Sequence, residues 1–297
     1  MLWALSNGQR LGWHSLTILG AALFAFLAGT AFVVRELSAK APLLNVSMFR
    51  VPGFAAGCVI SFCFGAGLFG STYLVPLFVQ QIQGFTATAS GLLLMPAGLV
   101  MALIFPIAGH MVDRFPAPAV IALGAVLLAL SSYLMGLMDA STMSWVIIGW
   151  VMLSRVGLGF GMPAIGTGSL RALDISQVSQ GSGAANFSRQ LGGALGVNLL
   201  SVTLDWRTAG HARVLIDTQT AGNVQTAELV NQFQGLAREA GLSLDQAEPA
   251  ALVFLREMVH FQAYVKGFQD SFLILAAVFL VSLAPVWVMY RFTRAAS

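Results

Sequence analysis

Long apolar stretches separated by short polar ones set the pattern of this chain. The hydrocarbon core of a bilayer is about 30 Å thick and needs roughly 20 mainly apolar helical residues to cross it. The stretches of that length without a charged side chain are 15–34, 54–79, 89–109, 117–138 and 271–290. Two more, 143–170 and 181–204, carry one arginine each, Arg155 and Arg189. The pattern predicts an all-α, polytopic membrane protein with about seven transmembrane helices.

Composition supports the same class. The chain has 297 residues, of which 57% are hydrophobic and 9% charged, whereas a soluble domain has about 25% charged residues. So few charges cannot cover a surface in water, and lipid must cover most of it. The net charge of +3 gives no indication of nucleic-acid binding. Cys58 and Cys63 lie on different faces of one apolar helix without metal-site spacing, so we expect no metal or cofactor.

The positions of lysine and arginine in short loops predict the orientation. One side of the membrane collects Arg35, Lys40, Arg50, Arg114, Arg171, Arg291 and Arg294. The short loops of the other side hold only Arg10, so we expect a cytoplasmic C-terminus. The first twelve residues lack the order of a signal peptide and look like the tail of a helix whose beginning is missing.

The segment 205–270 is too long for a hairpin and is expected on the outer, periplasmic side despite its basic residues. Apolar residues recur at helical spacing within 229–237 and again within 252–261. This spacing predicts two amphipathic helices resting on the outer membrane surface. The alternative is a partly disordered loop, because the segment starts rich in glutamine and poor in aromatic residues.

Two arginines inside predicted spans are the main candidates for function. A charged side chain at mid-membrane costs about 2.5–3.5 kcal/mol and usually faces a cavity or a partner. The alternative is a guanidinium that reaches the interface or bonds helix carbonyls, which suits Arg189 better than Arg155 because Arg189 lies nearer a span end. Around Arg189, a spacing of four and three residues places small and polar side chains on one helix face. These residues are Ser182, Asn186, Arg189, Gly193 and Gly196.

Acidic residues are absent from all seven predicted spans. Proton relays through membranes are usually built from such residues, so no group in these spans is predicted to carry a proton. The glycine-rich run 157–168 could be mistaken for a nucleotide-binding loop, but it lies within a span. Its glycines are expected to let helices approach closely.

Several motifs follow one another in an order that resembles a known family. Gly109, Asp113 and Arg114 fit a GxxxDR loop signature, and residues 186–196 read N-x-x-R-Q-x-G-G-x-x-G. The stretch 42–50 resembles a linker into a second bundle, and Arg155 is followed by alternating glycines. Together these motifs resemble the EmrB/QacA-type drug:proton antiporters, the fourteen-helix branch of the major facilitator superfamily.

The resemblance implies a domain organisation and a set of site residues. Residues 1–50 would hold the end of a truncated helix, one central linker helix and a cytoplasmic loop. Residues 51–297 would form the second six-helix bundle, with a long periplasmic loop at 205–270. The expected cavity or coupling residues are Arg155, Asn186, Arg189, Gln190, Tyr73 and Met95. The expected helix-packing residues are Gly157, Gly159, Gly161, Gly192, Gly193 and Gly196.

The loop signature implies a cytoplasmic latch of Gly109, Asp113 and Arg114, which biases one facing state of the transporter. The sequence departs from the family pattern at one point. Ala117 and Pro118 stand where the family often has two basic residues, so the latch is expected to be weaker.

The function implied by the resemblance is that of the C-terminal half of a proton-coupled efflux transporter, not an enzyme. It would export hydrophobic or cationic toxic compounds across the bacterial inner membrane, and it is expected to be incomplete alone. Implied partners are the lipid bilayer, protons, a missing N-terminal half, a periplasmic adaptor and an outer-membrane channel. Two alternatives stay open: a non-functional product of a truncated gene, and a seven-helix receptor or sensor. A retinal-type sensor would need a lysine in its last helix, and 271–290 contains none.

Overall fold

The computed structural model describes residues 7–8, 11–12, 14–38, 46–219, 224–239, 241 and 243–295. Within these ranges the chain is helical and contains no strand. It divides into two compact units: Met1–Val202 with Phe272–Ser297 is unit 1, and Thr203–Ser271 is unit 2. The predicted linker residues Pro42, Leu43 and Leu44, and the basic residues Arg10 and Lys40, lie outside the described ranges.

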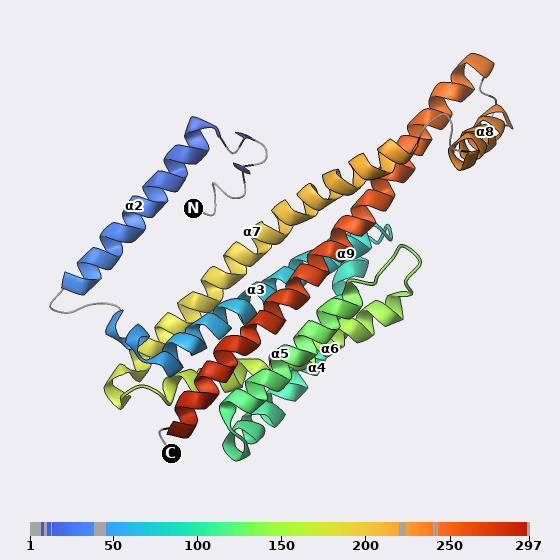
Figure 1. Cartoon of the computed structure of the whole chain (residues 1–297). Coiled ribbons are helices and arrows are strands. Elements are labelled where there is room, and N and C mark those ends of the chain that lie inside the picture. The colour runs from blue at the N-terminus through green and yellow to red at the C-terminus, as the bar shows by residue number, and fades with distance from the viewer. Residues whose placement is uncertain are drawn as a thin grey trace. The chain divides into compact units, whose positions relative to one another are not determined.

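Unit 1 holds most of the long helices (Figure 1). They are α2 (Leu16–Ser38), α3 (Pro52–Gln81), α4 (Ala87–Arg114), α5 (Ala117–Met135) and α6 (Ser144–Leu170). The first part of α7 (Val178–Thr218) and the last part of α9 (Leu244–Ala295) also belong to it. Two 3-10 turns, η1 (Val46–Arg50) and η2 (Ile175–Gln177), precede α3 and α7.

Six of the described helices are long and apolar enough to cross a membrane: α2, α3, α4, α5, α6 and α9. This number is close to the predicted seven and confirms a helical membrane protein. The remaining predicted span, 181–204, is helical and lies inside α7, but α7 is not among the six. Its serines, its asparagines and Arg189 lower its hydropathy, so α7 has a more polar composition than its neighbours.

Local sequence explains where several helices begin. Pro52 opens α3 at a position where its missing N–H costs nothing. The hydroxyl of Thr86 accepts a hydrogen bond from the Ala89 backbone N–H at 3.2 Å and caps α4. The turn between α3 and α4 contains Gly84 at φ +72°, a conformation that glycine adopts without strain.

One aspartate stabilises the turn that connects α5 and α6. The Asp139 carboxylate accepts hydrogen bonds from the Ser141 backbone N–H and hydroxyl and from the Thr142 hydroxyl, at 2.8–3.0 Å. These bonds, that from the Thr142 side chain above all, hold the pKa of Asp139 below its usual range. The turn lies outside the spanning segments and depends on an ionised carboxylate.

Small residues bring the helices of unit 1 together. Helix α6 packs against α3, α4 and α5. A Cβ added at Gly124 of α5 would lie 2.6 Å from the Gly157 carbonyl oxygen, and one added at Gly157 would lie 2.8 Å from the Gly124 oxygen. Helices whose backbones approach this closely gain van der Waals contact, as in other membrane proteins. Elsewhere in the core, the rings of Phe64 and Phe279 meet edge to face at 6.1 Å.

Unit 2 is helical at both stretches of 205–270 that were predicted to form amphipathic helices, but only the first of them is a separate helix. Residues 205–218 continue α7, α8 spans Val224–Glu239, and the second predicted amphipathic stretch is the first half of α9. Helix α9 runs unbroken from there into the last predicted span. Residues 250–271 contain one glycine, Gly267, and no proline, so nothing interrupts the helical hydrogen bonds.

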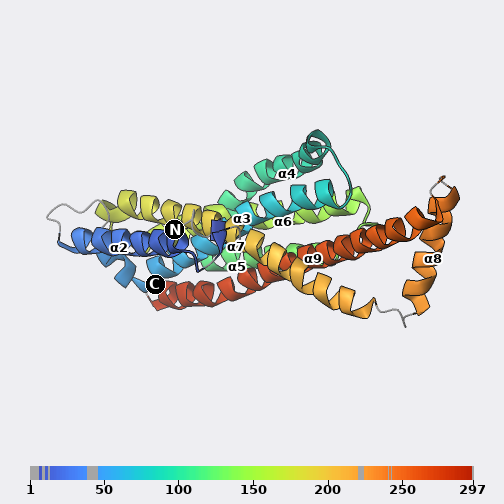
Figure 2. The same ribbon diagram turned by 90° about the horizontal axis from the view of Figure 1, so that it is seen from above.

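Helix α8 lies beside the first half of α9, as Figure 2 shows from above. The rings of Phe233 and Phe254 lie 3.9 Å apart between centroids. Leu236, on the same apolar stripe, keeps more than half of its surface exposed. The stripe predicted to rest on the membrane is therefore partly used within the protein.

Candidate substrate cavity

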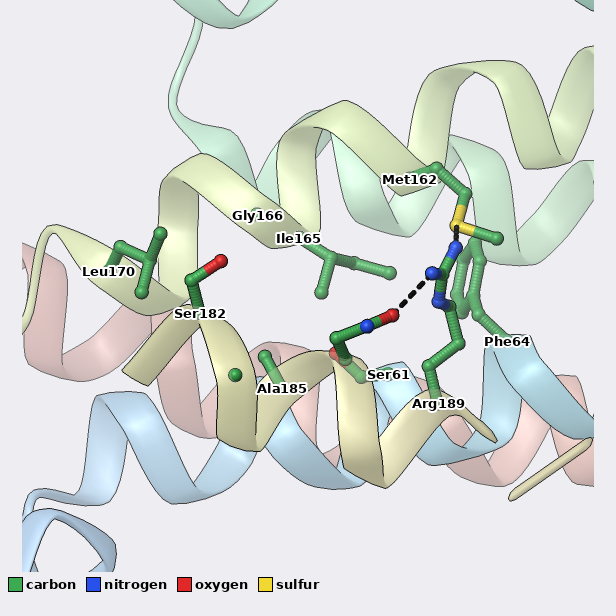
Figure 3. Close-up of a pocket in the computed structure, with 11 residues that line it drawn as sticks. Ser61, Phe64, Met162, Ile165, Gly166, Leu170, Ser182, Ala185 and Arg189 are labelled. Carbon is green, nitrogen blue, oxygen red and sulfur yellow. Dashed lines mark hydrogen bonds between the residues drawn. The ribbon is translucent and has the colours of Figure 1, made fainter. Parts of the chain in front are cut away.

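A cavity of about 350 Å³ lies between α3, α6 and α7 in unit 1. Its walls are mainly apolar, with hydroxyl groups and one cationic group among them (Figure 3). The lining residues are Ser61, Phe64, Met162, Ile165, Gly166, Leu170, Ser182, Gly183, Ala185, Asn186 and Arg189. Apolar walls with a few placed polar groups are typical of small-molecule sites.

Arg189 is held over this cavity by two neighbours (Figure 3). One guanidinium nitrogen donates to the Asn186 side-chain oxygen one turn earlier in α7. Another lies 3.7 Å from the Met162 sulfur on α6. The guanidinium carries five donors and a permanent charge, and no carboxylate among the described residues lines the cavity. This wall is therefore suited to hydrogen-bond acceptors on an otherwise apolar molecule.

Backbone contact between α3 and α7 fixes the position of Arg189. A Cβ added at Gly65 would lie 2.0 Å from the Arg189 carbonyl oxygen, and one added at Gly192 would lie 2.1 Å from the Phe62 oxygen. A Cβ at Gly196 would lie 2.7 Å from that of Ala66. Only glycine allows this approach. The glycines of the predicted G-G-x-x-G segment thus stand at the contact with α3.

The other predicted packing glycines also lie against neighbouring helices. A Cβ at Gly159 would come within 2.6 Å of Ile104, and one at Gly161 within 2.0 Å of the Phe64 ring. A Cβ at Gly193 would come within 2.2 Å of the Phe69 ring.

Arg155 does not line this cavity. Its side chain lies on α6 with 7% of its surface exposed and donates to the Thr72 hydroxyl oxygen on α3 at 3.1 Å. The Thr72 hydroxyl donates in turn to the Leu68 carbonyl oxygen at 2.7 Å, which leaves its oxygen free to accept. Arg155 therefore joins α6 to α3 from within the helix packing.

The remaining predicted cavity residues are dispersed. The Tyr73 hydroxyl donates to the Ser201 hydroxyl at 3.3 Å and joins α3 to α7. Gln190 points to the exposed surface of α7, and Met95 of α4 is 61% exposed. The structure brings together Asn186 and Arg189 of the predicted set, and not Arg155, Tyr73, Gln190 or Met95.

Sequence reasoning missed the residues that the other two helices contribute. Ser61 and Phe64 of α3 and Met162 of α6 line the cavity. Each lies in a nearly uniform apolar run, where no periodicity distinguishes a lining position from a packed one. One available signal was the position of Ser61 one turn before Gly65, since a hydroxyl beside a close helix crossing has to face an opening or a carbonyl.

The predicted latch residues lie at the end of α4. Arg114 is the last residue of α4, where its positive charge interacts favourably with the negative end of the helix dipole. It borders a hollow of about 420 Å³ together with His110, whose Nδ1 lies 2.8 Å from the Pro106 carbonyl oxygen. Asp113 is exposed and makes no ion pair within the described ranges. An added Cβ at Gly109 would meet no atom of the described residues within 4 Å.

Comparisons with known proteins give the family. The model of the Major Facilitator Superfamily matches residues 4–197. The chain is similar to the colistin resistance protein EmrB of Acinetobacter baumannii, with 26% identity over 94% of this chain and 54% of that protein. It is 27% identical to the tetracenomycin C resistance and export protein of Streptomyces glaucescens, over 96% of this chain and 53% of that protein.

A third relative is the lincomycin resistance protein LmrB of Listeria monocytogenes, 25% identical over 78% of this chain and 50% of that protein. The chain spans about half the length of the curated relatives it matches. The matched family is one of multi-pass membrane transporters and not of enzymes. With its apolar helices, close glycine crossings and a family match over 4–197, the chain belongs to the Major Facilitator Superfamily.

Proposed function

We propose that this chain is the C-terminal half of a drug-export transporter and that the Arg189 cavity forms one wall of its substrate path. The observation that carries the proposal is the guanidinium of Arg189, held by Asn186 over an apolar cavity of about 350 Å³. The relatives support the substrate class, since their names describe resistance to colistin and lincomycin and export of tetracenomycin C. The family supports transport rather than catalysis.

The chemistry of the wall defines what it recognises. Apolar side chains such as Phe64 and Ile165 offer surface to a hydrophobic compound, and Arg189 offers hydrogen bonds to a carbonyl, a phenol or an acid group. A cationic compound would be repelled by Arg189 alone. Export of cations therefore requires carboxylates from a companion half, because substrate sites in transporters with repeated halves form between the halves.

Proton coupling belongs to the same proposal. The spans predicted for this chain contain no aspartate or glutamate, so the proton carrier is assigned to the companion half. Asp113 and Arg114 at the end of α4 would form the cytoplasmic latch with that half, and the C-terminus would lie on the same side. A periplasmic adaptor and an outer-membrane channel would meet the transporter from the outer side.

Binding to the purified full chain tests the cavity directly. Nile red, an uncharged hydrophobic dye with a ring carbonyl, is titrated into the chain in detergent and followed by fluorescence polarisation. We expect Arg189→Ala to weaken binding about tenfold, the value of one lost charge-assisted hydrogen bond. Gln190→Ala is the matched control, since Gln190 is the next residue and does not line the cavity. Equal binding by Arg189→Ala and the unchanged chain would remove the cavity from the proposal.

Efflux tests the half-transporter assignment separately. In a host without its own pumps, the chain alone is expected to give no uncoupler-sensitive export of ethidium. Export by the chain alone would contradict the need for a companion half. The receptor alternative has no support among relatives named as transporters and resistance proteins.

A further inference from the structure

One end of the Arg189 cavity is bounded by a phenylalanine that other helices hold in place. Figure 3 shows Phe64, Met162 and Arg189 together at this end, and Leu170 and Ser182 at the other. Phe64 lines the cavity but is otherwise enclosed by protein, and none of its surface is exposed to solvent. Its ring therefore borders the cavity without projecting into it.

A recess on α6 receives this ring. A Cβ added at Gly161 would overlap the ring of Phe64, and the Cζ atom of the ring would lie 2.7 Å from it. The lack of a side chain at Gly161 permits this approach. Gly161 does not line the cavity itself, although the next residue, Met162, does. Gly161 therefore acts on the cavity through the position of Phe64.

A ring on α9 covers a second side of Phe64. Phe279 meets Phe64 edge to face, with ring centroids 6.1 Å apart. Phe279 lies in turn against α3, since a Cβ added at Gly67 would overlap its ring and lie 2.5 Å from its Cε1 atom. Only 1% of the surface of Phe279 is exposed, and Phe279 does not line the cavity. The position of Phe64 thus depends on two residues outside the cavity.

Close packing limits where the Phe64 ring can move. Protein interiors contain few voids larger than a water molecule, so a displaced ring moves to where space already exists. Protein atoms fill the sides toward Gly161 and Phe279. The cavity of about 350 Å³ supplies space on the side that Phe64 lines. A ring pushed out of its recess on α6 would therefore enter the cavity.

We propose that Gly161 and Phe279 are positioning residues that set the largest ligand the Arg189 cavity accepts, because they hold the Phe64 ring out of it. This inference rests on the proposed function, since it concerns the same cavity. A side chain added at Gly161 pushes the ring into the cavity and shortens it. A smaller side chain in place of Phe279 gives the ring space outside the cavity.

Two uncharged dyes of different size form the matched probe pair. Nile red and prodan each carry one carbonyl and one dialkylamino group, and prodan has the smaller fused-ring system. Binding of each dye to the purified full chain in detergent is measured by fluorescence polarisation. The readout is the ratio of the two dissociation constants, because a loss of folded protein affects both dyes alike and cancels. A change in this ratio reports the size of the site and not the stability of the chain.

The first variant fills the recess on α6. Gly161→Ala should weaken the binding of Nile red about tenfold relative to that of prodan, since the larger dye needs the space that the ring would enter. Gly149→Ala is the control, because Gly149 lies on the same helix and an added Cβ there would meet no described atom within 4 Å. An unchanged ratio in Gly161→Ala, or an equal change in Gly149→Ala, would overturn the proposal.

A double variant separates positioning from damage to the fold. Phe279→Ala makes space beside Phe64, so in Gly161→Ala/Phe279→Ala the displaced ring should move there instead of into the cavity. The ratio should then return to within about twofold of that of the unchanged chain, whereas two independent structural defects would add. A double variant with the same ratio as Gly161→Ala alone would contradict the proposal.

A change at Phe64 itself keeps the test decisive even if Gly161→Ala does not fold. Phe64→Leu removes the ring that limits the cavity and should favour Nile red over prodan by a few fold. An unchanged ratio would overturn the size limit while leaving the substrate cavity in place. Failure of both dyes to bind the unchanged chain would instead remove the cavity from the proposed function, and this inference with it.

Discussion

Helix α7 makes two different kinds of contact along its length. In unit 1 it meets α3 through glycines whose missing side chains let the backbones touch, at Gly65 and Gly192. In unit 2 it meets α9 through charged groups, with Arg207 and His211 both on Asp270. Close van der Waals packing suits a lipid setting, where apolar burial gives no net gain. Ion pairs suit a setting with water, which can solvate the groups when they part.

The glycine contact should be the less tolerant of the two. A Cβ at Gly192 meets the Phe62 carbonyl oxygen, which is backbone and cannot rotate away. Gly192→Ala should therefore destabilise the chain toward the upper end of about 1–3 kcal/mol, by forcing α3 and α7 apart. Thermal unfolding in detergent, followed by tryptophan fluorescence, gives the measurement.

Gly183→Ala is the control for that prediction, because Gly183 lies on the same helix and an added Cβ there would meet no described atom within 4 Å. It should be neutral or stabilising, since alanine is favoured over glycine in a helix by up to about 1 kcal/mol. If both variants melt alike, the α3–α7 contact is not limiting and the contrast between the two ends of α7 disappears.

The contact between α8 and α9 tests whether apolar packing also matters in unit 2. Phe233→Ala removes the ring that lies on Phe254 and should cost about 1 kcal/mol. The loss should be local, so hydrogen exchange of α8 amides is the suitable measurement. Leu236→Ala, at a position with 57% exposure, should change exchange much less. Equal effects would mean that α8 is not held through its ring contact.

The sequence predicted the helices of the fold better than their ends. Apolar length alone located the spans, because a bilayer imposes it. It could not show that α7 and α9 continue past the membrane-length stretches, because residues 205–218 and 244–270 keep helical propensity after hydropathy has fallen. The backbone determines whether a helix continues, whereas hydropathy depends on the side chains. A fall in hydropathy therefore does not mark the end of a helix.

Only the part of the cavity that lies on one helix could be predicted from the sequence. Asn186 and Arg189 share a helix, and their spacing fixes their common direction. Arg155 was expected beside them but bonds Thr72 of α3, because which neighbour a buried arginine meets depends on helix rotation and crossing. Those quantities come from contacts such as Gly65 against Arg189, which no single-helix pattern encodes.

The ion pairs of Asp270 with Arg207 and His211 should contribute less to stability than the glycine contact at the other end of α7. Asp270→Ala leaves Arg207 and His211 without their carboxylate and should cost up to about 1 kcal/mol, since the Arg207 side chain is 44% exposed. Raising the salt concentration should reduce the difference in melting temperature between this variant and the unchanged chain. The glycine variant should show no such salt dependence. An Asp270→Ala defect that does not respond to salt would make the contact steric rather than ionic.

The smallest effect on stability is expected at Asp139, whose carboxylate stabilises a turn through hydrogen bonds from Ser141 and Thr142. Its pKa is lowered mainly by the Thr142 hydroxyl, so its contribution to stability is present above the unfolded-state pKa of about 3.9. It is lost as the pH falls through the lower, folded-state value. Asp139→Ala should therefore be slightly less stable than the unchanged chain at pH 7, and the gap should narrow toward pH 3. A gap that widens on acidification would reverse the sign and show that the turn prefers the protonated acid.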